Sequence, residues 1–178
     1  SGAVVVDLPG HTVMPGFIDC HVHLTMRPQT QAQLWGMSGA DKALLGVEAL
    51  RILLDHGFTT VRDLGDTDVQ GYTTVSLRRA VDRGLITGPR VISAAHALST
   101  RGGHGDFSTL VSTETATSQA GLADGVDEIR RVVRTEISRG AQWIKFMATG
   151  GFSSPSDEPS MVPYSQEEIN VLVQTARG

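Results

Sequence analysis

The sequence predicts an α/β fold, specifically the first half of a (β/α)8 TIM-like barrel with four βα units. Short apolar strand patterns alternate with longer helical patterns along the chain, which is typical of parallel strands joined by helical crossovers. Long segments follow several of these strands, whereas the turns that enter the strands are short. This asymmetry is expected when one end of the sheet carries the functional groups. A doubly wound sheet is the other arrangement compatible with the pattern.

The first unit begins after the turn at Pro15-Gly16. We expect a strand over residues 17–24, a loop over 26–38 and a helix over 39–56 that ends at Gly57. The strand prediction rests on its apolar and β-branched residues Phe17, Ile18, Val22 and Leu24.

The second and third units follow the same order. A strand over 58–65 precedes a helix over 75–85, and a strand over 90–95 follows. A long loop rich in Gly, Ser and Thr then covers residues 98–123. The third helix, over 124–139, places apolar residues on one face.

The fourth unit contains a predicted strand over 142–147 and a helix over 167–176. The run Ser165-Gln166-Glu167-Glu168 has the form of a capping box at the start of that helix. A complete barrel needs about eight units and commonly about 250 residues. The sequence therefore predicts half of a barrel, with open sheet edges at the first and fourth strands.

Composition limits the possible functions. The chain has 178 residues, of which 40% are hydrophobic and 19% charged, as in a globular domain. A net charge of −4 without a basic run argues against nucleic acid as a partner. No apolar segment approaches the roughly 20 residues that a membrane span needs. The single cysteine, Cys20, and the lack of a leader-like opening predict a cytoplasmic location.

His21 and His23 are the strongest candidates for metal ligands. Strand side chains alternate with period two, so both imidazoles face one side of the sheet, where they suit an ion such as zinc. Asp19 lies on the same face, and we expect it to hold the other ring nitrogen of a ligand. Cys20 faces the opposite side, as a small buried residue. The alternative is two unrelated histidines with separate hydrogen bonds.

Lys145 is the second chemical candidate, because it lies within the apolar run Trp143-Ile144-Lys145-Phe146-Met147. Burial favours the neutral amine, which could add carbon dioxide to become a metal-bridging carbamate. It could instead form a Schiff base with a carbonyl substrate, as in a lyase or aldolase. A strand lysine that reaches solvent or pairs with an acid is the structural alternative.

The sequence resembles the amidohydrolase superfamily in these residues and in further motifs. Residues 10–23 look like its first barrel strand, and later motifs follow the order of the branch with imidazolonepropionase-like enzymes and prolidase-like Xaa-Pro or Xaa-Arg/Lys dipeptidases. These motifs are Thr59-Thr60-Val61-Arg62-Asp63-Leu64-Gly65, Gly88-Pro89-Arg90-Val91, Gly102-Gly103-His104-Gly105-Asp106 and Trp143-Ile144-Lys145-Phe146.

The resemblance implies roles for individual residues. His21 and His23 would bind the more buried of two divalent ions, expected to be zinc, and carboxylated Lys145 would bridge it to the second. His104 would be a catalytic, substrate-binding group that polarises an oxyanion. Asp63 would lie behind the ligands or cap the turn that follows its strand.

The sequence also departs from the family pattern. Two further histidines and a catalytic aspartate, which the family takes from strands five, six and eight, have no counterpart here. Residues 1–15 resemble the last strands of a small N-terminal β-domain, and residues 16–178 the partial barrel. The chain is therefore expected to be an N-terminal portion of the enzyme, carrying part of its active site.

The predicted function is a metal-dependent hydrolase of amide or peptide-like C–N bonds, acting on a dipeptide or another small molecule. Two alternatives remain open. One is a Schiff-base lyase that uses Lys145. The other is a non-catalytic half-barrel that self-associates through its open edges, as a homo-oligomer or with a complementing fragment.

Overall fold

The computed structural model describes residues 2–27, 31–69, 71–112, 116–152 and 157–178. Parts of the predicted loops, at 28–30 and 113–115, lie outside the described residues. The elements run in the order β1 (Phe17–Val22), α1 (Gln31–Gly36), α2 (Gly39–Asp55), β2 (Phe58–Asp63), α3 (Thr73–Asp82), β3 (Arg90–Ser93), α5 (Gly125–Arg139) and α6 (Gln166–Arg177).

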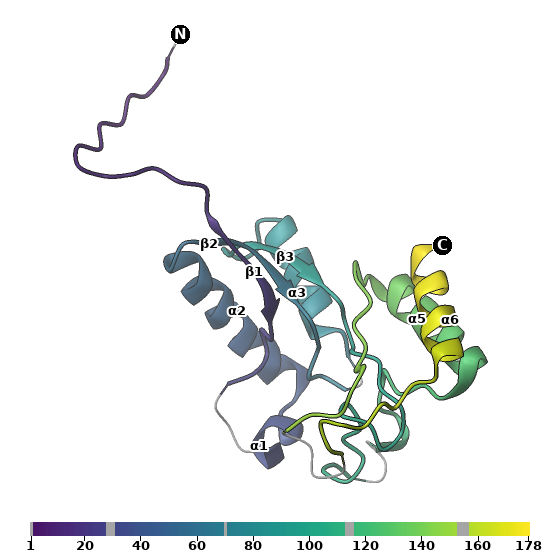
Figure 1. Cartoon of the computed structure of the whole chain (residues 1–178). Coiled ribbons are helices and arrows are strands. Elements are labelled where there is room, and N and C mark those ends of the chain that lie inside the picture. The colour runs from purple at the N-terminus through teal and green to yellow at the C-terminus, as the bar shows by residue number, and fades with distance from the viewer. Residues whose placement is uncertain (1, 28–30, 70, 113–115, 153–156) are drawn as a thin grey trace.

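The sheet is parallel, in the order β1-β2-β3, as the alternating pattern predicts (Figure 1). Val22 is opposite Asp63, and Asp63 is opposite Ser93, so the three strands end in register. Crossovers through α2 and α3 bring each strand back beside the preceding one. The carboxyl ends of all three strands therefore lie along one edge of the sheet.

The fourth predicted strand is not formed as a regular strand. Residues 142–147 run beside the chain that continues from β3 and form one parallel bridge, between Leu98 and Phe146. The Leu98 N–H donates to the Lys145 carbonyl at 2.8 Å, and the Met147 N–H donates to the Leu98 carbonyl at 2.9 Å. The segment lies where a fourth strand would lie. Among the described residues, its backbone bonds to that chain are those at Leu98 and one from the Gln142 N–H to the Ser93 carbonyl at 2.8 Å, too few consecutive rungs for a regular strand.

Helix boundaries largely follow the sequence signals. Ser38 caps α2 and Ser165 caps α6, each through a reciprocal capping box. Gly140, with φ of +117°, ends α5 in the left-handed conformation that glycine tolerates. The short helix α1 occupies part of the stretch predicted as a loop. The burial of Leu34 gives it an apolar anchor.

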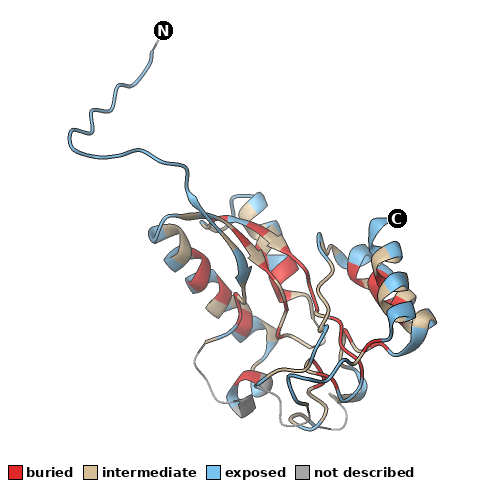
Figure 2. Cartoon of the chain, in the orientation of Figure 1, coloured by how far each residue is buried: buried red, intermediate tan, exposed pale blue. Residues whose placement is uncertain are grey.

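Two apolar clusters form the core, and Figure 2 shows buried residues concentrated on β2, β3 and the inner faces of the helices. The first joins the sheet to α2 and α3 through Leu24, Ala49, Leu50, Val61, Leu77 and Val91. The second joins α5, α6 and the loop after β3 through Leu98, Ala123, Ile129, Val132, Val133, Tyr164 and Leu172. The first cluster packs α2 and α3 against the sheet and thereby fixes the position of its strands.

The open edge at β1 matches the prediction of a half-barrel. β1 pairs with β2, and its side chains Phe17 and Ile18 are 49% and 66% exposed. Cys20 is also exposed, so its predicted burial is wrong. On the face turned away from the histidines, Val22 and Leu24 pack against the core cluster, whereas Cys20, nearer the start of the strand, is not covered.

The N-terminal segment extends away from the sheet (Figure 1). Residues 2–16 are exposed and form no strand, so the strands expected over 4–8 and 11–14 are not formed. Strands of this kind need neighbours to satisfy their backbone groups, and no described segment lies beside them. Assignment of residues 1–15 to a separate β-domain stays a prediction. In the described part of the chain, every helix is too short or too polar to cross a membrane.

Candidate metal and active site

The histidine pair lies at the sheet edge where the three strands end. The rings of His21 and His23 are 5.3 Å apart between centroids and meet at 61°. His21 is exposed, while His23 is partly buried. The predicted convergence of the two imidazoles on one side of β1 is therefore what the structure shows.

His23 is held in a form suited to metal binding. Its Nδ1 lies 3.2 Å from the carbonyl oxygen of Gly65, which can only accept a hydrogen bond. Nδ1 therefore carries the proton, and Nε2 keeps a lone pair that can coordinate an ion. Burial lowers the pKa of His23, and the nearby charges of His21 and Lys145 lower it further, against the opposing effect of the Gly65 bond. Both effects keep the ring neutral, as a ligand must be.

Asp63 supports His23 through the backbone. Its buried carboxylate accepts the N–H of Leu24 at 2.7 Å and the N–H of Gly65 at 3.2 Å. Leu24 directly follows His23, and Gly65 supplies the carbonyl that orients the ring. Burial raises the pKa of Asp63 to about 7, although the two backbone bonds oppose the shift. Asp63 thus holds the backbone at Leu24, which follows His23, and at Gly65, which bonds the His23 ring. Asp63 itself does not contact that ring.

Asp19 does not have the predicted contact. Its carboxylate accepts the backbone N–H of His21 at 2.9 Å, within the same strand. This short-range bond turns the carboxylate along the backbone, so it does not orient a ring nitrogen.

Lys145 lies near the histidines but is less buried than predicted. The residue is partly exposed, because the irregular segment 142–147 lies at an open side of the structure. Its positive charge is one of the smaller effects that lower the pKa of His23. Among the described residues, no three His, Cys, Asp or Glu side chains gather closely enough to hold a metal ion. The candidate ligands that the structure brings together are therefore the imidazoles of His21 and His23.

His104 and His23 line the same cavity, of about 190 Å³. His104 reaches it from the glycine-rich loop after β3, as the sequence predicts. Its Nδ1 lies 3.2 Å from Oδ2 of Asp157, a residue not singled out in the sequence. Met147, at the end of the lysine segment, also lines the cavity. Groups from three strand ends therefore meet in one space.

His96 belongs to a buried charged network behind this cavity. The carboxylate of Glu136, on α5, accepts bonds from the Tyr72 hydroxyl at 2.9 Å, the His96 backbone N–H at 3.1 Å and His96 Nδ1 at 3.1 Å. Nε2 of His96 lies 2.8 Å from the carbonyl oxygen of Asp68. Both ring nitrogens thus face acceptors, which requires the doubly protonated imidazolium.

The balance of forces on His96 agrees with this geometry. Burial alone would lower its pKa, but the hydrogen bond and charge of Glu136, the Asp68 carbonyl and the charge of Asp66 together raise it. Nearby, burial raises the pKa of Asp66, although its bonds to Thr74 and Asp68 oppose the shift. The network therefore ties α5 to the loop that follows β2 and carries Gly65.

A pH dependence of stability follows from this network. Because the pKa of His96 is raised on folding, its contribution is fully present below about pH 6.5, the ordinary histidine value, and is lost as pH rises through the higher folded value. We expect the free energy of unfolding, measured with urea, to fall with rising pH in this range. His96→Asn should flatten that slope. Tyr72→Phe, which removes a neutral donor, should lower stability and keep the slope; an unchanged slope in His96→Asn would contradict the assignment.

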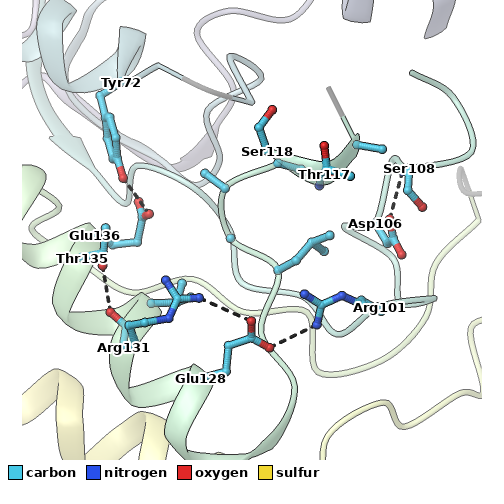
Figure 3. A pocket seen from close by; sticks show the side chains of 16 residues that line it. Tyr72, Arg101, Asp106, Ser108, Thr117, Ser118, Glu128, Arg131, Thr135 and Glu136 are labelled. Atoms are coloured by element: carbon cyan, nitrogen blue, oxygen red, sulfur yellow. Dashed lines mark hydrogen bonds and ion pairs between the residues drawn. The ribbon is translucent and has the colours of Figure 1, made fainter. Parts of the chain in front are cut away.

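Figure 3 shows a second cavity beside this network, with a volume of about 800 Å³. Tyr72 and Glu136 line it, together with charged groups on α5 and the loop after β3. Those charges neutralise one another, since Glu128 pairs with Arg101 at 3.1 Å and with Arg131 at 3.4 Å. None of the predicted site residues lines this cavity. The smaller cavity, which is lined by the imidazoles of His23, His96 and His104, is the better candidate active site.

Sequence reasoning missed three members of this region. Glu136 gave a signal, because it follows Ile129, Val132 and Val133 at helical spacing on the buried face of α5. A carboxylate at such a position needs a buried partner. His96 and Asp157 gave no comparable signal, since their partners are distant in the chain and belong to irregular segments.

A parallel sheet whose strands end around a histidine pair is a frequent arrangement in enzymes built on the (β/α)8 barrel. The model of the amidohydrolase family matches residues 12–178 of this sequence, and the chain belongs to that family. This agrees with the resemblance drawn from the motifs.

Individual relatives support the same assignment. Ochratoxinase from Aspergillus niger is 36% identical over 181 residues, covering 92% of this chain and 36% of the relative. The structure of an amidohydrolase superimposes with a TM-score of 0.85 at 38% identity, covering 100% of this chain and 44% of the other. A prolidase complexed with N-methylphosphonate-L-proline gives 0.81 at 38% identity, covering 98% and 45%. The chain therefore spans less than half the length of these relatives and corresponds to part of their barrel fold.

Proposed function

We propose that this chain provides the first part of the active site of a metal-dependent amidohydrolase that cleaves an amide or peptide-like C–N bond. The His21–His23 pair carries the proposal: two imidazoles 5.3 Å apart at the carboxyl end of a parallel strand. His23 is oriented by Gly65 so that Nε2 is its coordinating nitrogen. His21 and His23 would hold the ion, expected to be zinc, and Lys145 would join them as a carbamate.

The chain's own groups have separate tasks in this scheme. A bound zinc ion supplies a water of lowered pKa and polarises the scissile carbonyl. His104, in the same cavity as His23, would contact a substrate oxygen and hold or release a proton at Nε2. Asp63 keeps His23 in place through Leu24 and Gly65. The remaining ligands and the general base would come from a part of the enzyme outside this chain.

The relatives indicate the substrate class. One is a prolidase that binds N-methylphosphonate-L-proline and another is an ochratoxinase. We propose a dipeptide or an acylated amino acid as substrate. Of the alternatives, the Schiff-base lyase gives no role to the His21–His23 pair. Association through the exposed edge of β1, with a second copy or a complementing fragment, remains compatible with the proposed hydrolase.

Zinc titration of the chain tests the proposal. We expect His21→Ala and His23→Ala each to weaken zinc binding at least tenfold, because each removes one of few ligands; isothermal titration calorimetry measures the change. His56→Ala is the matched control, since His56 lies at the far end of α2 and bonds the Ile52 carbonyl. Added bicarbonate should strengthen binding in the wild type and not in Lys145→Ala. Equal zinc affinity in the wild type, His21→Ala, His23→Ala and His56→Ala would overturn the proposal.

A further inference from the structure

The His104 ring is enclosed by two segments distant in the sequence. On one side lies Asp157, whose side chain is 0% exposed and whose Oδ2 is 3.2 Å from Nδ1 of His104. The same Oδ2 accepts the backbone N–H of Gly151 at 2.6 Å. A fully buried carboxylate is therefore fixed by the backbone and directed at one nitrogen of the ring.

The ring also lies close to Gly151, the residue whose N–H bonds Asp157. A Cβ atom at Gly151 would lie 2.2 Å from Cε1 of His104, far inside contact distance. A Cβ at the preceding Gly150 would lie 1.9 Å from the carbonyl oxygen of Glu158. The pair Gly150-Gly151 thus lets the backbone pass close to both His104 and the segment that carries Asp157. Ring and carboxylate fit together as one packed unit.

The chemistry of a carboxylate decides which ring nitrogen is protonated. An ionised carboxylate only accepts hydrogen bonds, so Nδ1 must carry the proton, and Nε2, on the opposite side of the ring, is the nitrogen that can exchange one. We propose that Asp157 is the positioning residue for His104, fixing the Nδ1–H form so that Nε2 meets the substrate. The role toward substrate rests on the proposed function, whereas the fixed form of the ring does not.

The arrangement also joins two strand ends. His104 belongs to the loop after β3, and Asp157 to the loop after the Lys145 segment. The two loops are also near each other at Gly105 and Met147, since a Cβ added at Gly105 would lie 3.6 Å from Cγ of Met147. Asp157 therefore holds His104 in a constant position relative to the segment that carries Lys145.

The protonation form of His104 can be measured without metal or substrate. In the ¹⁵N-histidine-labelled chain, long-range ¹H–¹⁵N NMR distinguishes protonated from unprotonated ring nitrogens, and His104→Gln assigns the signals. We expect a protonated Nδ1 in the wild type and loss of this single form in Asp157→Ala. Asp157→Asn, nearly identical in shape, can present either its oxygen or its amide group and should give a mixture. Glu158→Gln, an exposed neighbour, is the matched control and should leave the signals unchanged.

Two outcomes would overturn the inference: a protonated Nε2 with bare Nδ1 in the wild type, or an unchanged Nδ1–H form in both Asp157 variants. If Asp157→Ala does not fold, shown by circular dichroism, Asp157→Asn alone decides between the outcomes. Failure of zinc binding in the preceding experiment would leave this result unaffected, so the two proposals can fail separately.

Discussion

Replacing Glu136 with alanine is expected to destabilise the protein by about 3–5 kcal/mol, the range for removing one partner of a buried ion pair. The variant leaves the His96 imidazolium and backbone N–H without their acceptor, and it also removes the partner of the Tyr72 hydroxyl. Such a loss is a large part of the roughly 5–15 kcal/mol that stabilises a typical domain. Urea unfolding followed by circular dichroism measures it.

Two variants make this result specific. Glu136→Gln keeps an oxygen acceptor but not the charge, so its loss should be intermediate. Glu128→Ala, on the same helix, breaks ion pairs whose arginine side chains are 59% and 66% exposed, and should cost at most about 1 kcal/mol. If Glu136→Ala is no more destabilising than Glu128→Ala, the buried network does not stabilise the fold.

The second large effect is expected at Asp63. Asp63→Ala leaves the N–H groups of Leu24 and Gly65 unsatisfied, which should cost about 2–4 kcal/mol. Relief of an unfavourably buried carboxylate, whose pKa is raised to about 7, offsets part of this cost. Leu24 follows His23, and the Gly65 carbonyl bonds its ring, so zinc affinity should fall along with stability. Urea unfolding measures the stability, and calorimetry on the same sample measures the zinc affinity.

Asp19→Ala is the matched control for Asp63→Ala. Asp19 lies on β1, and its carboxylate accepts a backbone N–H in an exposed setting, so its loss should be within about 0.5 kcal/mol. A destabilised Asp63→Ala protein with unchanged zinc affinity would show that Asp63 supports the fold and not the position of His23.

Some parts of the candidate site could be predicted from local sequence alone. His21 and His23 share a side of β1 because period-two alternation is a property of any strand, independent of its neighbours. The N-termini of α2 and α6 follow from Ser38 and Ser165, whose capping hydrogen bonds join residues only three positions apart. Local rules therefore suffice where the partner is local.

Other features depend on which segments pack against a residue in the folded chain. Residues 142–147 have a strand pattern but form only one bridge, with Leu98 of the irregular segment after β3. Asp19 was expected at a ring nitrogen, yet it bonds the nearer backbone N–H of His21. Lys145 was expected to be buried, but its exposure depends on which segments cover it.

By itself, then, the sequence determined the parallel α/β architecture, the histidine pair and the glycine-rich loop that carries His104, since periodicity, turn residues and caps act over a few positions. Only the tertiary structure decided that Asp157 meets His104, that Glu136 meets His96, and that Asp63 braces His23. These contacts join positions 39 to 53 residues apart. Their energies arise from burial and charge, which exist only after the chain has folded.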